Sequence, residues 1–179
     1  MNNEIKQLIQ ALWIILPAYT ANGAPIIAAK IMDTFGFKKH PIDGGKMFID
    51  GRRIFGDNKT WEGFIAGIIV GVLTSIIQMF FEVSISLHSL YLIRGIALGF
   101  GAMMGDLIGA FIKRRLGLKP GAPLPLIDQL SFLLVAIAVS LKFIDITFKQ
   151  FVYIVITTVI LHITTNYLAY KLGLKNVPW

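Results

Sequence analysis

Three long segments of the chain contain no aspartate, glutamate, lysine or arginine, namely residues 7–29, 63–81 and 150–170. Each is close to the ~20 residues that a helix needs to cross the hydrocarbon core of a bilayer. Two further apolar segments, 89–112 and 126–144, are interrupted only by Arg94, Asp106, Asp128 and Lys142. Charged residues make up only 15% of the chain, against ~25% in a typical soluble domain. The sequence therefore predicts an all-α membrane protein with about five transmembrane helices, at roughly residues 7–32, 61–81, 89–112, 126–144 and 150–170.

Basic residues are distributed unevenly between the two ends of these segments. Six lysines and arginines follow the first span, four follow the third and two lie in the C-terminal tail, whereas the other side has only Lys6, Lys142 and Lys149. Because cytoplasmic loops are enriched in lysine and arginine, we expect the N-terminus outside, and the C-terminus and both basic loops in the cytoplasm. We interpret Lys171 and Lys175 as topology signals alone.

The connections on the outer side are short. The loops at residues 82–88 and about 145–148 cannot fold separately, so we expect residues 1–179 to form a single membrane domain. The chain contains no cysteine, which excludes disulfides, zinc thiolates and thiol nucleophiles.

The long loop after the first span contains two local signals. "MFIDGRRIF" places Asp50-Gly51 between apolar and β-branched residues, which is typical of a hairpin turn. Thr60 precedes "WEGFIAGIIVG" and is expected to cap the second span, with Trp61 at the membrane interface.

The first span contains Pro17, Asn22, Gly23 and Pro25 in its middle. Proline removes a backbone donor and clashes with the preceding turn, so we expect the helix to be interrupted there. In lipid, such an interruption requires protein groups or a polar cavity to satisfy the freed carbonyls. Two interpretations remain open, namely a proline kink packed in the bundle and a broken helix that directs Asn22 into a polar cavity.

The third span contains both a smooth stripe and a carboxylate. Gly101, Gly105 and Gly109 recur every four residues and allow another helix to approach closely. Asp106 adjoins this stripe, so we expect its carboxylate to face the bundle interior. Intramembrane carboxylates cost several kcal/mol and are usually functional.

Asp106 and Asp128 are expected to share one pocket near the cytoplasmic surface. Asp106 precedes Lys113 by two helical turns, or ~10 Å, and Asp128 lies about one turn into the fourth span if Pro125 is its first residue. Two neighbouring carboxylates repel each other. A divalent cation between them removes the repulsion, and Mg²⁺ typically uses one or two carboxylates plus phosphate oxygens.

Basic residues lie at the cytoplasmic ends around the same pocket. Attachment to anionic lipid is the simplest interpretation of such residues, but together with two buried carboxylates they indicate a polyphosphate site. The residues in question are Lys46, Arg52, Arg53, Lys59, Lys113, Arg114, Arg115 and Lys119.

Three blocks of this sequence resemble a known family. "GD" followed by "KRR" and then "PLPLIDQLSF" is similar to the signature of the CTP-dependent phosphatidate cytidylyltransferases, and "GDNKTWEGFIAG" is similar to a second element of that family. "PAYTANGAPI" and "PIDGGKMFIDGRRIFGDNKTWEG" are most similar to its archaeal branch, the CDP-archaeol synthases. The blocks occur in family order between about residues 16 and 132. Two positions depart from the family pattern, where Ala110 replaces a serine and Ser131 replaces an aspartate.

The resemblance implies transfer of a cytidylyl group from CTP to an isoprenoid glycerol ether phosphate, with release of pyrophosphate, at the cytoplasmic face of the cell membrane. It implies Mg²⁺ held by Asp106 and Asp128, with Lys113 as a third catalytic residue. Eight further residues are expected to bind substrate, namely Asn22, Lys46, Arg53, Lys59, Thr60, Arg114, Arg115 and Lys119. We expect contacts with membrane lipids and none with nucleic acid, and a homodimer is a further hypothesis. We assign no catalytic role to His162.

Two other functions are alternatives to this one. A membrane CDP-alcohol phosphotransferase would need its own clustered aspartates beside a glycine-alanine-arginine pattern, which the sequence lacks. A small ion-coupled transporter would use Asp106 as an ion relay and is favoured by inverted repeats, which we do not find.

Overall fold

Five helices make up the fold in a computed structural model, which describes residues 3–81 and 88–178. They are α1 (Asn3–Phe35), α2 (Trp61–Phe81), α3 (His88–Arg115), α4 (Ile127–Ser140) and α5 (Phe148–Lys171). The described residues form no strand, so the all-α prediction is confirmed. Within those residues, four helices are long and apolar enough to cross a membrane, whereas α4 has only 14 residues. Of the outer loop expected at 82–88, residues 82–87 lie outside the described part.

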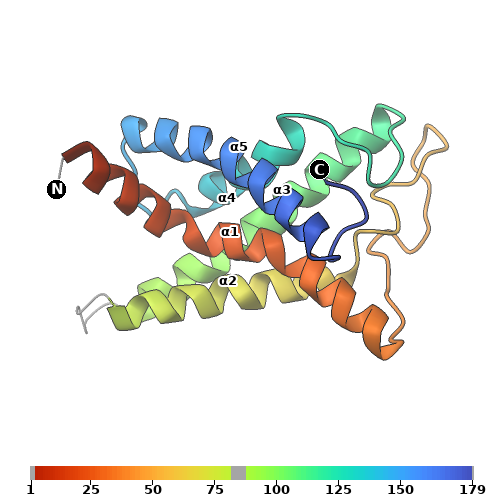
Figure 1. Cartoon of the computed structure of the whole chain (residues 1–179), viewed down its shortest axis with the longest axis horizontal. Coiled ribbons are helices and arrows are strands. Elements are labelled where there is room, and N and C mark those ends of the chain that lie inside the picture. Colours follow the sequence, from red (N-terminus) through yellow and green to blue (C-terminus); the bar gives the residue numbers. More distant parts are fainter. Residues whose placement is uncertain (1–2, 82–87, 179) are drawn as a thin grey trace.

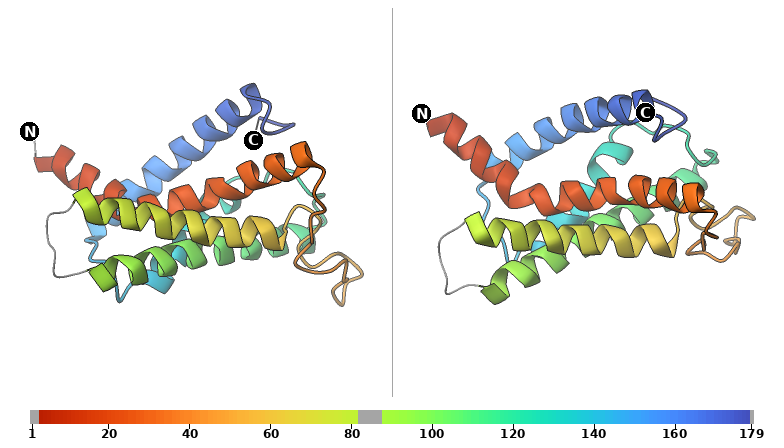
Figure 2. Two further views of the ribbon diagram at one scale, coloured as in Figure 1. Left: turned by 90° about the horizontal axis from the view of Figure 1, so that it is seen from below. Right: turned by 60° about the horizontal axis from the view of Figure 1, so that its bottom comes forward.

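The helices place both basic loops at the same end of the bundle. Figure 1 shows the first basic loop (residues 36–60) and the second (residues 116–126) at one end, and the N-terminus at the other. Figure 2 shows α5 diverging from α1 toward the C-terminal end of α5. The axes of these two helices therefore separate toward the end that carries the basic loops.

The first helix is continuous through both prolines, so of the two interpretations left open the broken helix is wrong, although Asn22 does line a polar cavity. Because Pro17 has no N–H, the carbonyl of Trp13 loses its usual helical donor. The buried side chain of Gln78 in α2 donates to that carbonyl at 2.5 Å and accepts from Arg94 at 2.9 Å. A donor from a neighbouring helix thus replaces the missing backbone bond.

The glycine stripe of α3 is where α4 packs, as predicted. A Cβ on Gly105 would lie 2.3 Å from the carbonyl oxygen of Ser131, and one on Gly101 would lie 2.6 Å from the Cα of Ala136. Real Cβ atoms are not found at such distances, so any side chain here would push the helices apart. This close contact holds Asp106 of α3 near the start of α4.

The start of α4 differs from the expectation. The helix begins at Ile127 rather than Pro125, because Leu126 adopts a left-handed conformation with φ 66°. This conformation is uncommon for a residue with a side chain. Asp128 consequently lies in the first turn of α4 instead of one turn inside it. Its carboxylate accepts a hydrogen bond from the N–H of Leu124 at 2.8 Å, which holds it beside the second basic loop where α4 begins next to α3.

Two local predictions for the first basic loop are confirmed. Met47 and Arg53 form an antiparallel bridge around the turn at Gly51, whose φ is 71°. The hydroxyl oxygen of Thr60 accepts the N–H of Gly63 at 3.2 Å and caps α2.

Candidate active site

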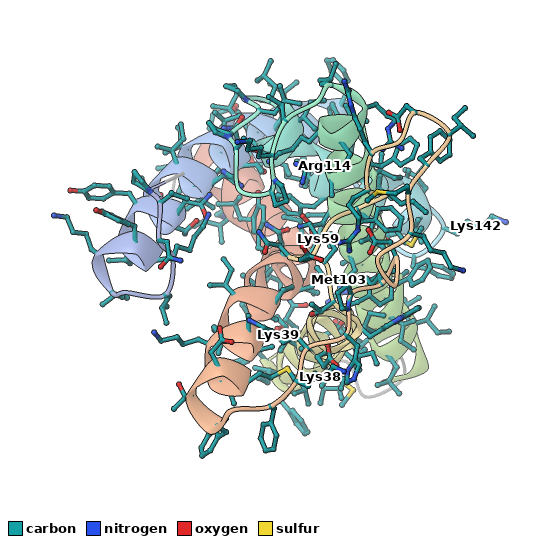
Figure 3. All side chains as sticks on the ribbon, turned by 90° about the vertical axis from the view of Figure 1, so that its right-hand side faces the viewer. Lys38, Lys39, Lys59, Met103, Arg114 and Lys142 are labelled. Carbon is teal, nitrogen blue, oxygen red and sulfur yellow. The ribbon has the colours of Figure 1, made fainter. Side chains whose placement is uncertain are left out.

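A cavity of about 670 Å³ opens at the end of the bundle that carries the basic loops. Ligand pockets usually measure ~300–1,000 Å³, so this one is large enough for a nucleotide. All five helices contribute to its lining, together with both basic loops and residues 173–177 of the tail. Figure 3 looks onto this end, with Lys59 near the centre of the view and Lys142 pointing away from the bundle.

The cavity brings together seven of the eleven residues that the sequence analysis selected. Those that line it are Asn22, Lys59, Thr60, Asp106, Lys113, Arg114 and Asp128. Four others, all in the described part of the chain, are not among its lining residues, namely Lys46, Arg53, Arg115 and Lys119.

Each of the two carboxylates faces a lysine. Lys59 Nζ donates to both oxygens of Asp106 at 2.7 and 2.6 Å, and Lys113 Nζ donates to those of Asp128 at 2.8 and 3.0 Å. All four side chains remain partly accessible, with exposed fractions between 13% and 32%. The carboxylates can therefore be reached from the cavity, and their mutual repulsion is compensated by neighbouring cations.

The donor set suits a hard cation that completes its coordination with substrate oxygens. The described residues contain no group of three or more His, Cys, Asp or Glu side chains that could hold a metal by themselves. Asp106 and Asp128 offer only carboxylate oxygens, and Ser131, which also lines the cavity, adds a hydroxyl. Mg²⁺ is commonly bound by one or two carboxylates together with phosphates and water. The residues present fit such an ion.

Arg114 and Arg115 have different surroundings although they are neighbours. Arg114 is buried beside Gly56, where an added Cβ would lie 3.2 Å from the guanidinium and the φ of 98° also favours glycine. Arg115 lies over the rings of Phe48 and Phe111, with its Cζ 4.7 and 4.6 Å from their centroids. It also donates to the carbonyl oxygen of Arg53 at 2.7 Å. Arg114 thus reaches the cavity, whereas Arg115 attaches the first basic loop to α3.

The first basic loop is organised around the buried carboxylate of Asp43. Arg53 donates to it at 2.5 and 3.2 Å, and the backbone N–H groups of Gly45, Phe55 and Gly56 donate at 3.1, 3.0 and 2.9 Å. Burial by itself would raise the pKa of Asp43, but these hydrogen bonds hold it well below its ordinary range. Arg53 therefore shapes the loop that covers the cavity.

The Asp43 carboxylate should make the conformation of this loop depend on pH. A carboxylate whose pKa is lower in the folded than in the unfolded state stabilises the folded state at pH values above the unfolded pKa. This stabilisation is lost progressively as the pH falls from the unfolded toward the folded pKa. We expect hydrogen-exchange protection of the Gly45, Phe55 and Gly56 amides to persist from pH 7 down to about pH 4 and then to decline, because the ordinary aspartate pKa is ~3.9. Asp43→Asn should reduce this protection already at pH 7. Undiminished protection at pH 3 in the unsubstituted protein would contradict the assignment.

Part of the cavity lining, on α5 and the tail, was not predicted from the sequence. His162, Asn166 and Lys175 all line the cavity, although the sequence assigned no catalytic role to His162 and only a topology signal to Lys175. His162 and Asn166 are one helical turn apart, which puts two polar groups on the same face of an apolar helix. That spacing in the sequence could have identified both residues as cavity-lining. No feature of the sequence could have identified Lys175, because its position depends on how the tail folds.

A second cavity of about 370 Å³ lies between α1 and α5 and is mostly apolar. It shares part of its lining with the larger cavity, so the two adjoin. The shared residues are Asn22, Ile26, His162, Asn166 and Leu174. A polar space and an apolar space therefore meet at the gap between α1 and α5.

Comparison with known proteins extends over nearly the whole chain. The family model described as CarS-like CDP-archaeol synthase matches residues 4–179. The CDP-archaeol synthase of Thermococcus gammatolerans is 42% identical over 98% of both chains, and that of Pyrococcus furiosus is 42% identical over 96% of this chain and 98% of the relative. A solved structure of an intramembrane enzyme for archaeal membrane lipid biosynthesis superposes with a TM-score of 0.76. It is 35% identical and the match covers 89% of this chain and 94% of that one.

Proposed function

The chain belongs to the CDP-archaeol synthase family, and from this premise we propose that its two adjoining cavities bring CTP and a lipid phosphate together over Asp106 and Asp128. The reaction of the family is the CTP-dependent formation of CDP-archaeol. The observation that supports this use of the site is the junction of a basic polar cavity with an apolar one. The first suits a nucleotide, and the second suits the hydrocarbon chains of a lipid.

The chemistry requires positioning and charge compensation rather than an activated nucleophile. The second pKa of a phosphate monoester is about 6, so the lipid phosphate is largely dianionic at neutral pH. One of its oxygens attacks the α-phosphorus of CTP, a P–O bond forms, and the bond to the pyrophosphate leaving group breaks. No protein side chain has to remove a proton.

Asp106 and Asp128 would hold Mg²⁺, as the donor set allows. When bound, the ion neutralises phosphate oxygens and compensates the charge that develops on the leaving group. Lys59, Lys113 and Arg114 supply further positive charge along the cavity wall. CTP and a lipid phosphate bring about six negative charges, which is more than one or two Mg²⁺ ions balance.

The lipid would enter sideways between α1 and α5. Its chains occupy the apolar cavity while its phosphate reaches the junction, where Asn22 of α1 offers an amide donor. CTP enters from water beneath the two basic loops. Thr60 caps α2 at the cavity wall and contributes a hydroxyl to the nucleotide side.

Labelled CTP provides the direct test of this arrangement. The purified protein, mixed with an isoprenoid glycerol ether phosphate, is expected to transfer label from α-labelled CTP to the lipid fraction only when Mg²⁺ is present. Transfer of label without divalent metal would exclude the metal role of Asp106 and Asp128. A phosphotransferase would release CMP from a CDP-lipid instead, and a transporter would show no transfer.

The orientation of the protein in the cell membrane can be tested separately. Ile49 at the tip of the first basic loop is 93% exposed, and the chain contains no cysteine. In intact cells, an impermeant thiol reagent should label Ile49→Cys only after permeabilisation, because we propose that this loop and the site face the cytoplasm. Asp145→Cys, at the opposite end, should be labelled directly. The reverse pattern would overturn the topology.

The single-domain boundary at residues 1–179 and the homodimer stay predictions.

A further inference from the structure

The C-terminal tail contributes a lysine to the cavity. Gly173 has a φ of 69° and ends α5, and the N–H of Leu174 donates back to the carbonyl of Ala169 at 2.9 Å. This is the usual way in which a glycine after a helix reverses the chain. The reversal places Leu174 in the lining of both cavities and Lys175 in that of the larger one.

Lys175 is held in place by two residues of α5. Its Nζ donates to the Oδ1 of Asn166 at 2.8 Å, and the amide nitrogen of Asn166 lies 2.9 Å from the Nδ1 of His162. Asn166 is 7% exposed. Its amide is neutral, so it orients the ammonium group without neutralising the charge.

The electrostatic surroundings of Lys175 connect it to the reacting centre. Burial lowers the pKa of Lys175, and the charge of Asp128 opposes this lowering. Asp106 also favours the charged form, while Lys113 and Lys59 disfavour it. A phosphate group that enters the cavity would therefore favour the charged form of Lys175 further.

We propose that Lys175, oriented by Asn166 and His162, binds the phosphate monoester of the lipid substrate. The proposal rests on the proposed function of the two cavities. It assigns Lys175 to the lipid rather than to CTP because of where its supports lie. His162 and Asn166 belong to both cavities, so a lipid whose chains fill the space between α1 and α5 brings its phosphate to this wall. Lys113 and Arg114 belong to α3, on another wall.

Separate Michaelis constants for the two substrates test this assignment. Lys175→Met keeps an apolar stem of similar length and removes the charge. We expect it to raise the KM for the lipid phosphate about tenfold or more, since hydrogen bonds to charged groups are among the stronger ones. The KM for CTP should stay within about twofold, because that substrate does not depend on the contact.

Three controls separate binding from a structural effect. Lys175→Arg should restore most of the affinity for the lipid phosphate. Lys171→Met should have no effect, because Lys171 lies over the ring of Tyr167, 5.6 Å from its centroid, and is not among the described residues that line either cavity. Asn166→Ala should raise the same KM but add little to Lys175→Met, since it acts through the same contact.

Equilibrium binding of CTP with Mg²⁺, measured without lipid, should be unchanged in Lys175→Met and also reports on folding. The proposal is overturned if the KM for CTP rises with or instead of that for the lipid, or if neither changes. If the wild-type protein transfers no label, the proposed function itself is overturned. If the wild type is active and Lys175→Met changes neither KM, only the proposal for Lys175 is overturned and the proposed function stands.

Discussion

Replacing Asp106 by asparagine is expected to lower turnover by about a thousandfold or more, while the protein still folds. The substitution preserves the size of the side chain and removes the charge that would hold Mg²⁺. It also leaves Lys59 facing a neutral amide at a position where its Nζ now lies 2.6 Å from a carboxylate oxygen. Initial rates of labelled CTP transfer at saturating substrates measure the effect, and Asp128→Asn should behave similarly.

The control for this prediction is a carboxylate away from the site. Asp145 is exposed and lies in the connection between α4 and α5, which Figure 1 shows away from the basic loops, so Asp145→Asn should keep wild-type activity. Partly exposed ion pairs contribute only ~0–1 kcal/mol, so thermal unfolding in detergent should be similar for all three variants. If Asp128→Asn retained near-normal Mg²⁺-dependent activity, Asp128 would have to be removed from the metal site.

Lys113→Ala is expected to lower kcat/KM for CTP by about a hundredfold, since a preorganised cation stabilises the charge that develops in the transition state. The ammonium group of Lys113 is mostly buried and contacts Asp128, so it is fixed beside the place where the phosphates would react. Lys46→Ala should cost much less, because Lys46 is not among the described residues lining the cavity. Steady-state kinetics with varied CTP would measure both.

Lys171→Ala serves as the reference for charge alone, since it removes a cation from the same end of the chain without touching either cavity. It should leave kcat/KM unchanged. Equally small effects of Lys113→Ala and Lys171→Ala would mean that the basic residues in the last turn of α3 act only as topology signals.

The sequence determined those features that arise from neighbouring residues or from a regular spacing. Uncharged segments of sufficient length specify helices in a bilayer, because unpaired backbone groups are too costly in hydrocarbon. The glycine spacing of α3 specified a close helix contact, since residues four apart lie on one face. The turn at Gly51 and the cap at Thr60 depend on a few consecutive residues. Asp106 was recognisable as a candidate functional residue because a carboxylate is costly inside an apolar span.

The tertiary structure decided what depends on partners far apart in the sequence. Pro17 leaves α1 unbroken because Gln78, 65 residues from Trp13, donates to the freed carbonyl. Arg114 and Arg115 have the same charge, yet packing against the first basic loop sends only Arg114 to the cavity. Lys175 reaches it because Gly173 turns the tail back and Asn166 receives its ammonium group. Charge and spacing along the chain can mark a residue as a candidate, but the direction in which its side chain points is set by contacts that form only when distant segments pack together.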